Sequence, residues 1–391
     1  MSGDARARSG AASAPDPALE DGVLAARELP EEPPPFKRAR SRREPPERIH
    51  VALPSWVGDV VMCTPALRAL RRAYPDAHLV CEGRPHLEEL LPSALFDAYV
   101  DGPPRGLRAT VRRARELRRD RFDLSVLLAE SERAALAPFL ARVPVRAGYA
   151  RGCARRVLLT DALARPLGSD GAPLAFSMVE RYLRVMRMLG VPDAGDAMEV
   201  RVTDTARRTV DARLAALGVA DDAPLATIVA GAAYGSAKTW PPEHFARAAD
   251  RIFEERGWRA VLAPGPGEER LAAAVADASR TSVVALTGPL LGLTELAALL
   301  ERSRVVLTND TGPRSMAVAL DRPVVALVGP SDEGHTLHHL ERQRVLIEDV
   351  DCRPCGLKVC PIDHRCMARI EPERAVRAVD ALVGPPGGTG D

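Results

Sequence analysis

An aspartate near the start of the folded part of the chain is placed where it could act as a general base. Asp59 follows the apolar run 49–53 and opens a helical stretch, and Gly58 before it allows a tight turn. A carboxylate at such a strand-to-helix turn faces a cleft and can accept a proton from a hydroxyl. The alternative is that Asp59 only caps the helix.

Lys238 is a second candidate, because lysine is rare in this chain. Lysine accounts for only three of the 54 basic residues. Lys238 lies in a turn of small residues after the apolar run 225–230, with Ser236 beside it and Pro241 at the next helix start. A compact ammonium among small residues suits a phosphate group, so we expect Ser236 and Lys238 to bind a phosphorylated donor. The alternative for Lys238 is an ordinary surface cation.

A third polar turn, formed by Asp310, Thr311 and Gly312, follows the apolar run 304–307 and begins another helix. A helix amino terminus that carries a hydroxyl and a glycine can cradle a diphosphate. Asp310 is expected either to bind sugar hydroxyls or to cap the helix. The turn 329–332 should end at the same edge of the sheet, so that three turns converge on one pocket.

Carboxylates elsewhere support a ribose contact better than a metal site. Glu268 follows the apolar run 258–263, where a Rossmann-like fold places a carboxylate on ribose; Glu269 is the alternative, as is a solvated helix start. Asp349 and Asp351 formally spell a D-x-D motif, a pattern that can hold a metal ion, but they follow a strand and precede a cysteine cluster at the rim. We therefore expect no metal in the site.

Four of the seven cysteines lie close together near the end of the chain, at Cys352, Cys355, Cys360 and Cys366. A structural metal, a redox-sensitive pair and simple reduced loop cysteines are all compatible with this spacing.

The elements that must position these residues alternate between strand and helix. Such alternation predicts parallel βαβ units, and hence an α/β fold of two doubly wound, Rossmann-like domains facing a central cleft. In the first domain the pattern predicts strands over 49–53, 78–81 and 122–129 and helices over 60–74, 105–121 and 177–189. In the second it predicts strands over 225–230, 258–263, 282–286, 304–307 and 323–328, with helices starting near Pro241, Glu268, Thr294 and Thr311.

The domain boundaries follow from changes in composition. We expect a disordered, basic and proline-rich tail over 1–47, a first domain over 48–205, a second over 206–384, and a flexible end over 385–391. The basic cluster 37–43 is read as a solvated linker, with contact to an anionic membrane face as the alternative.

Composition excludes several classes of partner. The 54 basic and 53 acidic residues leave a net charge of +1, and aromatic residues make up 4%, so neither a cationic field nor a stacking platform for nucleic acid is expected. No uncharged run is long enough for a spanning helix, and the start of the chain lacks a signal-peptide pattern. A reducing cytoplasm is the expected location.

Four stretches of the chain carry a resemblance to a known family. In the same order, they are similar to the signature stretches of glycosyltransferase family 9, the ADP-heptose:lipopolysaccharide heptosyltransferases, and most of all to its heptosyltransferase II members. The four stretches read LPSWVGDVVMCTPALRALRRAYPDA, GAAYGSAKTWPPEHFA, TNDTGPRSMAVALDRPVVALVGPSD and CRPCGLKVCPIDHRCM. The resemblance implies a GT-B fold, with the acceptor on the first domain and the nucleotide-sugar donor on the second.

The resemblance also implies an activity and roles for residues. It implies metal-independent, inverting transfer of heptose from ADP-heptose, with no cofactor, to the inner core of lipopolysaccharide. Asp59 then matches the catalytic base, Lys238 a phosphate contact, and Asp310 with Thr311 and Gly312 the donor turn. The lipid-linked acceptor would place the enzyme peripherally at the cytoplasmic face of the inner membrane.

One position departs from the family pattern. Ser315 stands where the family usually has a histidine. This keeps open a GT-B transferase with a different nucleotide-sugar donor. A non-catalytic protein that binds a nucleotide sugar is the alternative from another functional class.

Overall fold

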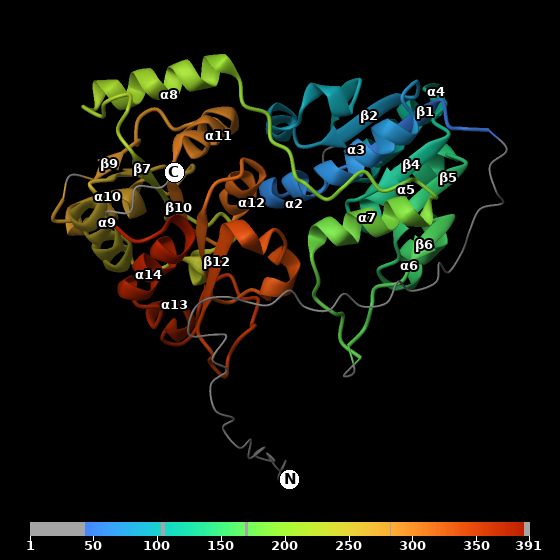
Figure 1. Cartoon of the computed structure of the whole chain (residues 1–391). Helices are drawn as coiled ribbons and strands as arrows, with labels where there is room; N and C mark the ends of the chain where they lie inside the picture. The colour runs from blue at the N-terminus through green and yellow to red at the C-terminus, as the bar shows by residue number, and fades with distance from the viewer. Residues whose placement is uncertain (1–43, 103–105, 169–170, 282, 387–391) are drawn as a thin grey trace, which may run out of the picture.

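Two parallel sheets of six strands each organise the computed structural model, which describes residues 44–102, 106–168, 171–281 and 283–386 (Figure 1). The strand orders are β3-β2-β1-β4-β5-β6 and β12-β11-β10-β7-β8-β9. In each sheet the chain starts at a central strand, moves to one edge and then returns to build the other half. This is the doubly wound order that places ligands at the carboxyl ends of the central strands.

The first sheet is centred on β1, which pairs in parallel with β2 and β4; Ile49 lies between Leu79 and Leu124. Its strands are β1 Arg48–Ala52, β2 His78–Gly83, β3 Ala98–Asp101, β4 Leu124–Leu127, β5 Val145–Tyr149 and β6 Asp161–Leu163. The helices of this half are α2 Val57–Met62, α3 Thr64–Ala73, α4 Leu107–Arg119, α5 Glu132–Ala141, α6 Gly152–Leu158 and α7 Met178–Met188, with short 3₁₀ turns η1 Pro85–Leu90 and η2 Ser93–Leu95.

The second sheet is centred on β7 and β10, which pair in parallel. Its strands are β7 Leu225–Val229, β8 Arg259–Leu262, β9 Val284–Ala285, β10 Val305–Asn309, β11 Val324–Val328 and β12 Gln343–Ile347. The helices are α8 Asp204–Ala216, α9 Pro242–Arg256, α10 Glu269–Ala278, α11 Leu293–Arg302, α12 Gly312–Ala319, α13 Arg365–Ala368 and α14 Pro372–Val383, with 3₁₀ turns η3 Ser236–Lys238, η4 Glu333–Thr336 and η5 Leu340–Arg342. The predicted α/β class with two Rossmann-like sheets is confirmed.

The helix predicted over 60–74 is in fact two helices, α2 and α3, which meet at Cys63. Pro65 lies in the first turn of α3 and has no N–H to donate to the carbonyl of Val61. The hydroxyl of Thr64 donates to that carbonyl instead, at 2.7 Å. The break lets α2 end after little more than one turn, while α3 continues along the sheet.

Several strands lack a predicted counterpart. The sequence pattern did not indicate β3, β5, β6 or β12, which lie toward the sheet edges, and β9 is shorter than the predicted run 282–286. Polar residues interrupt the apolar runs of three of these strands: Arg146 in β5, Asp161 in β6 and Gln343 with Arg344 in β12. The central strands β7, β10 and β11 are buried at every position and were predicted.

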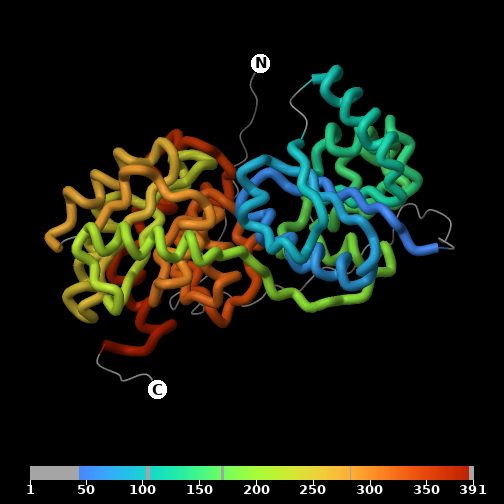
Figure 2. The backbone as a smooth tube through the Cα atoms, turned by 90° about the horizontal axis from the view of Figure 1, so that it is seen from above, coloured from blue at the N-terminus to red at the C-terminus, as the bar shows by residue number. Residues whose placement is uncertain are grey.

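The connection between the two halves first runs along the first domain. The N–H of Arg201 donates to the carbonyl of Leu90, and that of Glu199 donates to the hydroxyl of Thr64. Helix α8 then packs against α11 of the second half, and Figure 2 shows the two halves side by side with this segment crossing between them. Of the predicted tail 1–47, only residues 44–47 are described, and the basic cluster 37–43 lies outside the described residues.

The apolar core continues from one domain to the other. One buried cluster includes Val60 and Val61 of α2 as well as Met316 and Ala317 of α12. The two helices pack against each other where the domains meet. Within the described ranges, none of the helices combines the length and the apolar character needed to cross a membrane.

Candidate active site

A cavity of about 620 Å³ lies between the domains, at the carboxyl ends of both sheets. Its walls bring together residues that are far apart in the sequence. The first domain contributes Trp56, Gly58, Asp59, Glu130, Arg151, Arg165, Arg181 and Tyr182, and the second contributes Tyr234, Lys238, Asp310, Thr311, Gly312, Ser315, Ser331, Asp332, His335 and Thr336, among others. The three turns predicted to converge on one pocket from the second sheet do so.

Asp59 enters the cavity from the first turn of α2, just beyond the end of β1. The N-cap residue of this helix is Trp56, so Asp59 stands inside the helix and not at the cap position. The carboxylate of Asp59 therefore points into the cavity, and Trp56, not Asp59, is the N-cap residue of α2. This placement leaves the carboxylate accessible to a substrate hydroxyl.

The surroundings of Asp59 make its carboxylate a better base. Burial is the largest influence, and the nearby carboxylate of Glu130 adds to it, so that the pKa of Asp59 rises from 3.8 to about 6. Lys238 and Arg181 act in the opposite direction, and Asp310 adds a smaller increase. At neutral pH Asp59 is therefore mostly ionised, yet it binds a proton more readily than an exposed aspartate does.

Lys238 lies at the end of η3 and reaches across to the turn after β10. Its Nζ donates to the backbone carbonyl of Asp310 at 2.9 Å and forms an ion pair with Oδ2 of Asp310 at 3.2 Å. The ammonium also lies 5.4 Å from the ring centroid of Tyr234. An ammonium has three donors, and Asp310 takes two, so one is left for a ligand in the cavity.

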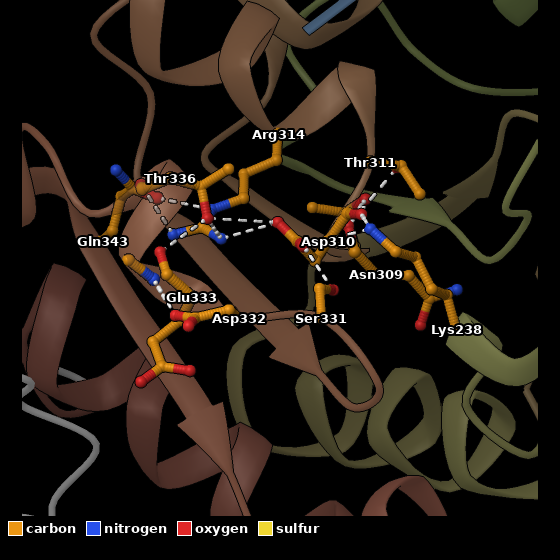
Figure 3. A network of polar contacts seen from close by, with 12 residues as sticks. Lys238, Asn309, Asp310, Thr311, Arg314, Ser331, Asp332, Glu333, Thr336 and Gln343 are labelled. Atoms are coloured by element: carbon orange, nitrogen blue, oxygen red, sulfur yellow. Dashed lines mark hydrogen bonds and ion pairs between the residues drawn. The ribbon is translucent and has the colours of Figure 1, made fainter. Parts of the chain in front are cut away.

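Asp310 is the centre of a buried polar network, shown in Figure 3, with Arg314 and Lys238 on opposite sides of its carboxylate. Oδ1 accepts a hydrogen bond from Arg314 at 2.8 Å, and Oδ2 accepts one from the hydroxyl of Ser331 at 2.8 Å. Arg314 is fully buried and also donates to Gln343 and Thr336. The carboxylate thus holds Lys238 in place more than it offers free oxygens to a sugar.

The charge of Asp310 is secured by the same contacts. Burial alone would raise its pKa, but the charges of Lys238 and Arg314 and the hydrogen bond from Ser331 hold that pKa far below its usual range. Two cations around one carboxylate leave one net positive charge at this turn. That charge is complementary to an anionic group.

Thr311 and Gly312 form the amino terminus of α12 and line the cavity. Thr311 is the N-cap residue and Gly312 the first helical residue. Ser315, one turn further, is buried and also lines the cavity. The position that departs from the family pattern is therefore part of the site.

Two of the predicted donor ligands are not among the residues that line the cavity. Ser236 is exposed at the start of η3, two residues before Lys238. Glu268 is the N-cap residue of α10, in the connection after β8. It lies over the backbone of Gly231, and its Oε2 accepts a hydrogen bond from the N–H of Gly265 at 2.8 Å. It borders a separate, narrow hollow between β7 and β8.

Sequence reasoning missed an ionic cluster on the first domain, formed by Glu130, Arg165 and Arg181. Oε1 of Glu130 lies 2.8 Å from Nε of Arg181, and Oε2 accepts a hydrogen bond from Nε of Arg165 at 3.1 Å. The guanidinium of Arg181 also lies over the ring of Tyr149. Glu130 follows the predicted strand 122–129 directly, which was a usable signal, whereas the arginines were hidden among many others.

The remaining motifs lie outside the cavity. Asp349 and Asp351 are exposed. The four clustered cysteines border a small apolar hollow of about 70 Å³, and one of them, Cys366, has a pKa raised to about 11 by burial and by the other cysteines. Across the residues that the structure describes, no three or more His, Cys, Asp or Glu side chains form a group suited to hold a metal ion.

Comparison with known proteins agrees with this architecture. Lipopolysaccharide heptosyltransferase 2 of Salmonella typhimurium is 30% identical over 363 residues, which cover 87% of this chain and 99% of the relative. The structure of Escherichia coli ADP-heptose lipopolysaccharide heptosyltransferase II superposes with a TM-score of 0.67 at 27% identity, covering 86% of this chain and 98% of that one.

A further solved structure supports the fold alone. The family 9 glycosyl transferase of Veillonella parvula superposes with a TM-score of 0.72 at 23% identity, covering 86% of this chain and 97% of that one. The two Rossmann-like domains thus form a GT-B fold, as predicted. The sequence model of glycosyltransferase family 9 (heptosyltransferase) matches residues 110–365. This chain belongs to glycosyltransferase family 9.

Proposed function

We propose that this protein transfers heptose from ADP-heptose to the inner core of lipopolysaccharide, with inversion at the anomeric carbon. One observation carries the proposal: Asp59 of the first domain and the turn of Lys238 and Asp310 of the second line the same cavity. A base on one wall and a cationic turn on the other are what a transfer between an acceptor hydroxyl and a nucleotide-sugar donor requires. The full-length similarity to heptosyltransferase 2 supports this choice of donor and acceptor.

In the proposed reaction Asp59 removes the proton from an acceptor hydroxyl. The oxygen attacks the anomeric carbon of the heptose as the bond from that carbon to the diphosphate breaks, and ADP leaves with the electron pair. The raised pKa of Asp59, about 6, favours proton uptake and still leaves the group ionised at neutral pH. Attack from the side opposite the leaving group inverts the anomeric centre.

The second domain is proposed to bind and stabilise the leaving diphosphate. Lys238 has one donor left after its two contacts with Asp310. The amino terminus of α12, at Thr311 and Gly312, adds N–H groups and the positive end of the helix dipole. These groups meet the developing negative charge, so we propose that neither a metal ion nor a cofactor is needed.

Ser236 and Glu268 require a different role or a movement. Neither residue is among those that line the cavity. We propose that the adenosine part of the donor extends from the cavity toward β8 and that Ser236 and Glu268 bind it there. Glu268, at the N-cap of α10 in the connection after β8, is on the side of the sheet where a ribose contact is expected.

The test is transfer by the purified protein. ADP-heptose and a heptose-deficient lipopolysaccharide acceptor should give a product one heptose heavier by mass spectrometry, while UDP- and GDP-sugars should give none. Transfer from another nucleotide sugar in place of ADP-heptose would instead support a GT-B transferase with a different donor, the alternative suggested by Ser315. Binding of nucleotide sugars without turnover of any of them would support a non-catalytic protein.

We also propose that the enzyme works at the cytoplasmic face of the inner membrane, in peripheral contact with it. The proposal rests on the lipid-linked acceptor, which must reach the cavity between the domains. Flotation of the protein with acceptor-containing vesicles, compared with acceptor-free vesicles, tests it. If the protein floats with neither kind of vesicle, membrane contact is contradicted.

A further inference from the structure

The backbones of the two domains touch at a pair of glycines. Gly58 is the second residue of α2, and Gly312 is the first residue of α12. A Cβ atom added to Gly312 would lie 2.7 Å from Cβ of Val57 and 3.1 Å from the backbone nitrogen of Gly58. A Cβ atom added to Gly58 would lie 3.3 Å from Oγ of Ser315 and 3.4 Å from Cα of Gly312. Neither position accepts a methyl group without some displacement.

The groups proposed for the reaction are attached to these same helices. Asp59 follows Gly58 directly, and Asp310 lies two residues before Gly312. The distance between α2 and α12 therefore sets the distance between the proposed base and the donor turn. A larger residue at the contact would move the two groups apart even if it left each domain intact.

Other contacts hold the domains at the same separation. Buried apolar side chains of α2 and α12 belong to one continuous cluster. The N–H of Leu293 in the second domain donates to Oε1 of Glu89 in the first at 3.2 Å. Gly334 lies so close to Ala175 that a Cβ atom there would be 2.7 Å from its carbonyl oxygen. A strain introduced at Gly58 is thus resisted by contacts on several sides of the interface.

We propose that Gly58 and Ser315 are positioning residues, whose close contact across the domain interface holds Asp59 in register with the donor turn. The proposal rests on the transferase function argued above. It gives Ser315 a role in the spacing of the domains, in addition to its place in the cavity wall. Small displacements matter here because a misplacement of about 1 Å can cost about a hundredfold in rate.

The decisive variant is Gly58→Ala, because it adds only one methyl group, on the first domain, at the contact with Ser315 and Gly312. Alanine is also the better helix former, so the substitution favours α2 itself. We expect kcat for heptose transfer to fall about tenfold, since the neighbouring atoms must give way by a few tenths of an ångström. The KM for ADP-heptose should stay within about twofold of the parent value, and the melting temperature should not fall, since no core contact is removed.

Rescue by a second substitution distinguishes positioning from a general defect. Ser315→Ala removes the Oγ that the new methyl group would approach most closely. The double variant Gly58→Ala with Ser315→Ala should therefore regain most of the activity of Ser315→Ala alone. Gly292→Ala is the control, since a Cβ there approaches no atom closer than 3.9 Å and the residue, the N-cap of α11, also lies at the start of a helix.

The outcomes separate this inference from the proposed function. A parent enzyme that transfers heptose, with Gly58→Ala equally active, would overturn the positioning role alone. Loss of activity that Ser315→Ala does not relieve would overturn it as well, because the methyl group would then act through something other than this contact. A parent enzyme with no transfer from ADP-heptose would contradict the proposed function, and with it the role inferred here.

Discussion

The ammonium of Lys238 lies 3.2 Å from Oδ2 of Asp310, although the two residues are 72 positions apart in the sequence. The same ammonium also donates to the backbone carbonyl of Asp310. Since the carboxylate is itself held by Arg314 and Ser331, the position of Lys238 is fixed before any donor binds. The net charge of the donor turn and the position of Lys238 thus depend on the whole hydrogen-bonded network and not on one residue.

We expect Lys238→Ala to weaken donor binding and to slow transfer. A charge-assisted contact to phosphate is worth about 1.5 to 3 kcal/mol, which corresponds to about a 10- to 150-fold loss. Calorimetry with ADP and the rate of transfer would both report it. Lys37→Ala, in the segment outside the described residues, serves as the control and should change neither; unchanged values for Lys238→Ala would remove this residue from the site.

Asp59→Asn should abolish most of the activity and leave the fold intact. An amide has no useful basicity, so turnover should drop at least about a hundredfold, while donor binding on the other domain stays normal. The raised pKa of Asp59 means that its ionisation costs stability as the pH rises from about 4 to about 6. At pH 7 the neutral asparagine should therefore melt at the parent temperature or slightly above it.

A marked fall in melting temperature for Asp59→Asn would contradict this account, because it would assign the residue a structural role. Turnover close to that of the parent would remove it as the base. Differential scanning fluorimetry and a radiolabelled transfer assay give the two readouts separately.

The pH dependence of turnover should show that the charge of Glu130 raises the pKa of Asp59. Because the base acts when ionised, kcat should fall about tenfold per pH unit below the pKa of Asp59, which lies near 6. Glu130→Gln removes a negative neighbour, so the pKa of Asp59 should drop and the acid limb should move to lower pH. Glu132→Gln, exposed in the first turn of α5, is the control and should leave the limb in place; an unmoved limb in Glu130→Gln would exclude the coupling.

Arg314→Met should destabilise the protein strongly. Arg314 is fully buried against Asp310, and removal of one partner of a buried pair costs about 3 to 5 kcal/mol. Arg342→Met removes an ion pair in which Arg342 contacts both carboxylate oxygens of Asp321, but that pair is half-exposed and its loss should cost less than about 1 kcal/mol. Urea unfolding of the two variants checks the difference, and equal losses would be inconsistent with the proposed importance of the buried network.

Chelator should leave transfer intact. The proposed reaction places the diphosphate charge on Lys238 and the amino terminus of α12, so treatment with EDTA should not change kcat. Activity that is lost and returns with magnesium would contradict this mechanism. Activity that returns only with zinc would point to the cluster of Cys352, Cys355, Cys360 and Cys366.

The sequence by itself determined the fold class and the residues at the ends of the central strands. Predicted strands such as 225–230 and 304–307 are local patterns, and the residues that follow them must lie at the carboxyl edge of a parallel sheet. Asp59, Lys238 and Asp310 could be selected for that reason. The outer strands were missed, because they depend on pairing at a sheet edge. The break at Cys63 was also missed, although Pro65, which has no N–H to donate to the carbonyl of Val61, was a local signal for it.

Only the tertiary structure decided which of these residues share a site. It placed Ser236 on the surface and Glu268 in a separate hollow, and it added Glu130 and Arg181 from the other domain. It also turned Asp310 from a free carboxylate into the centre of a buried network. Contacts across a domain interface join segments with no relation along the chain, so no local pattern encodes them, and the packing of α2 against α12 fixes the site.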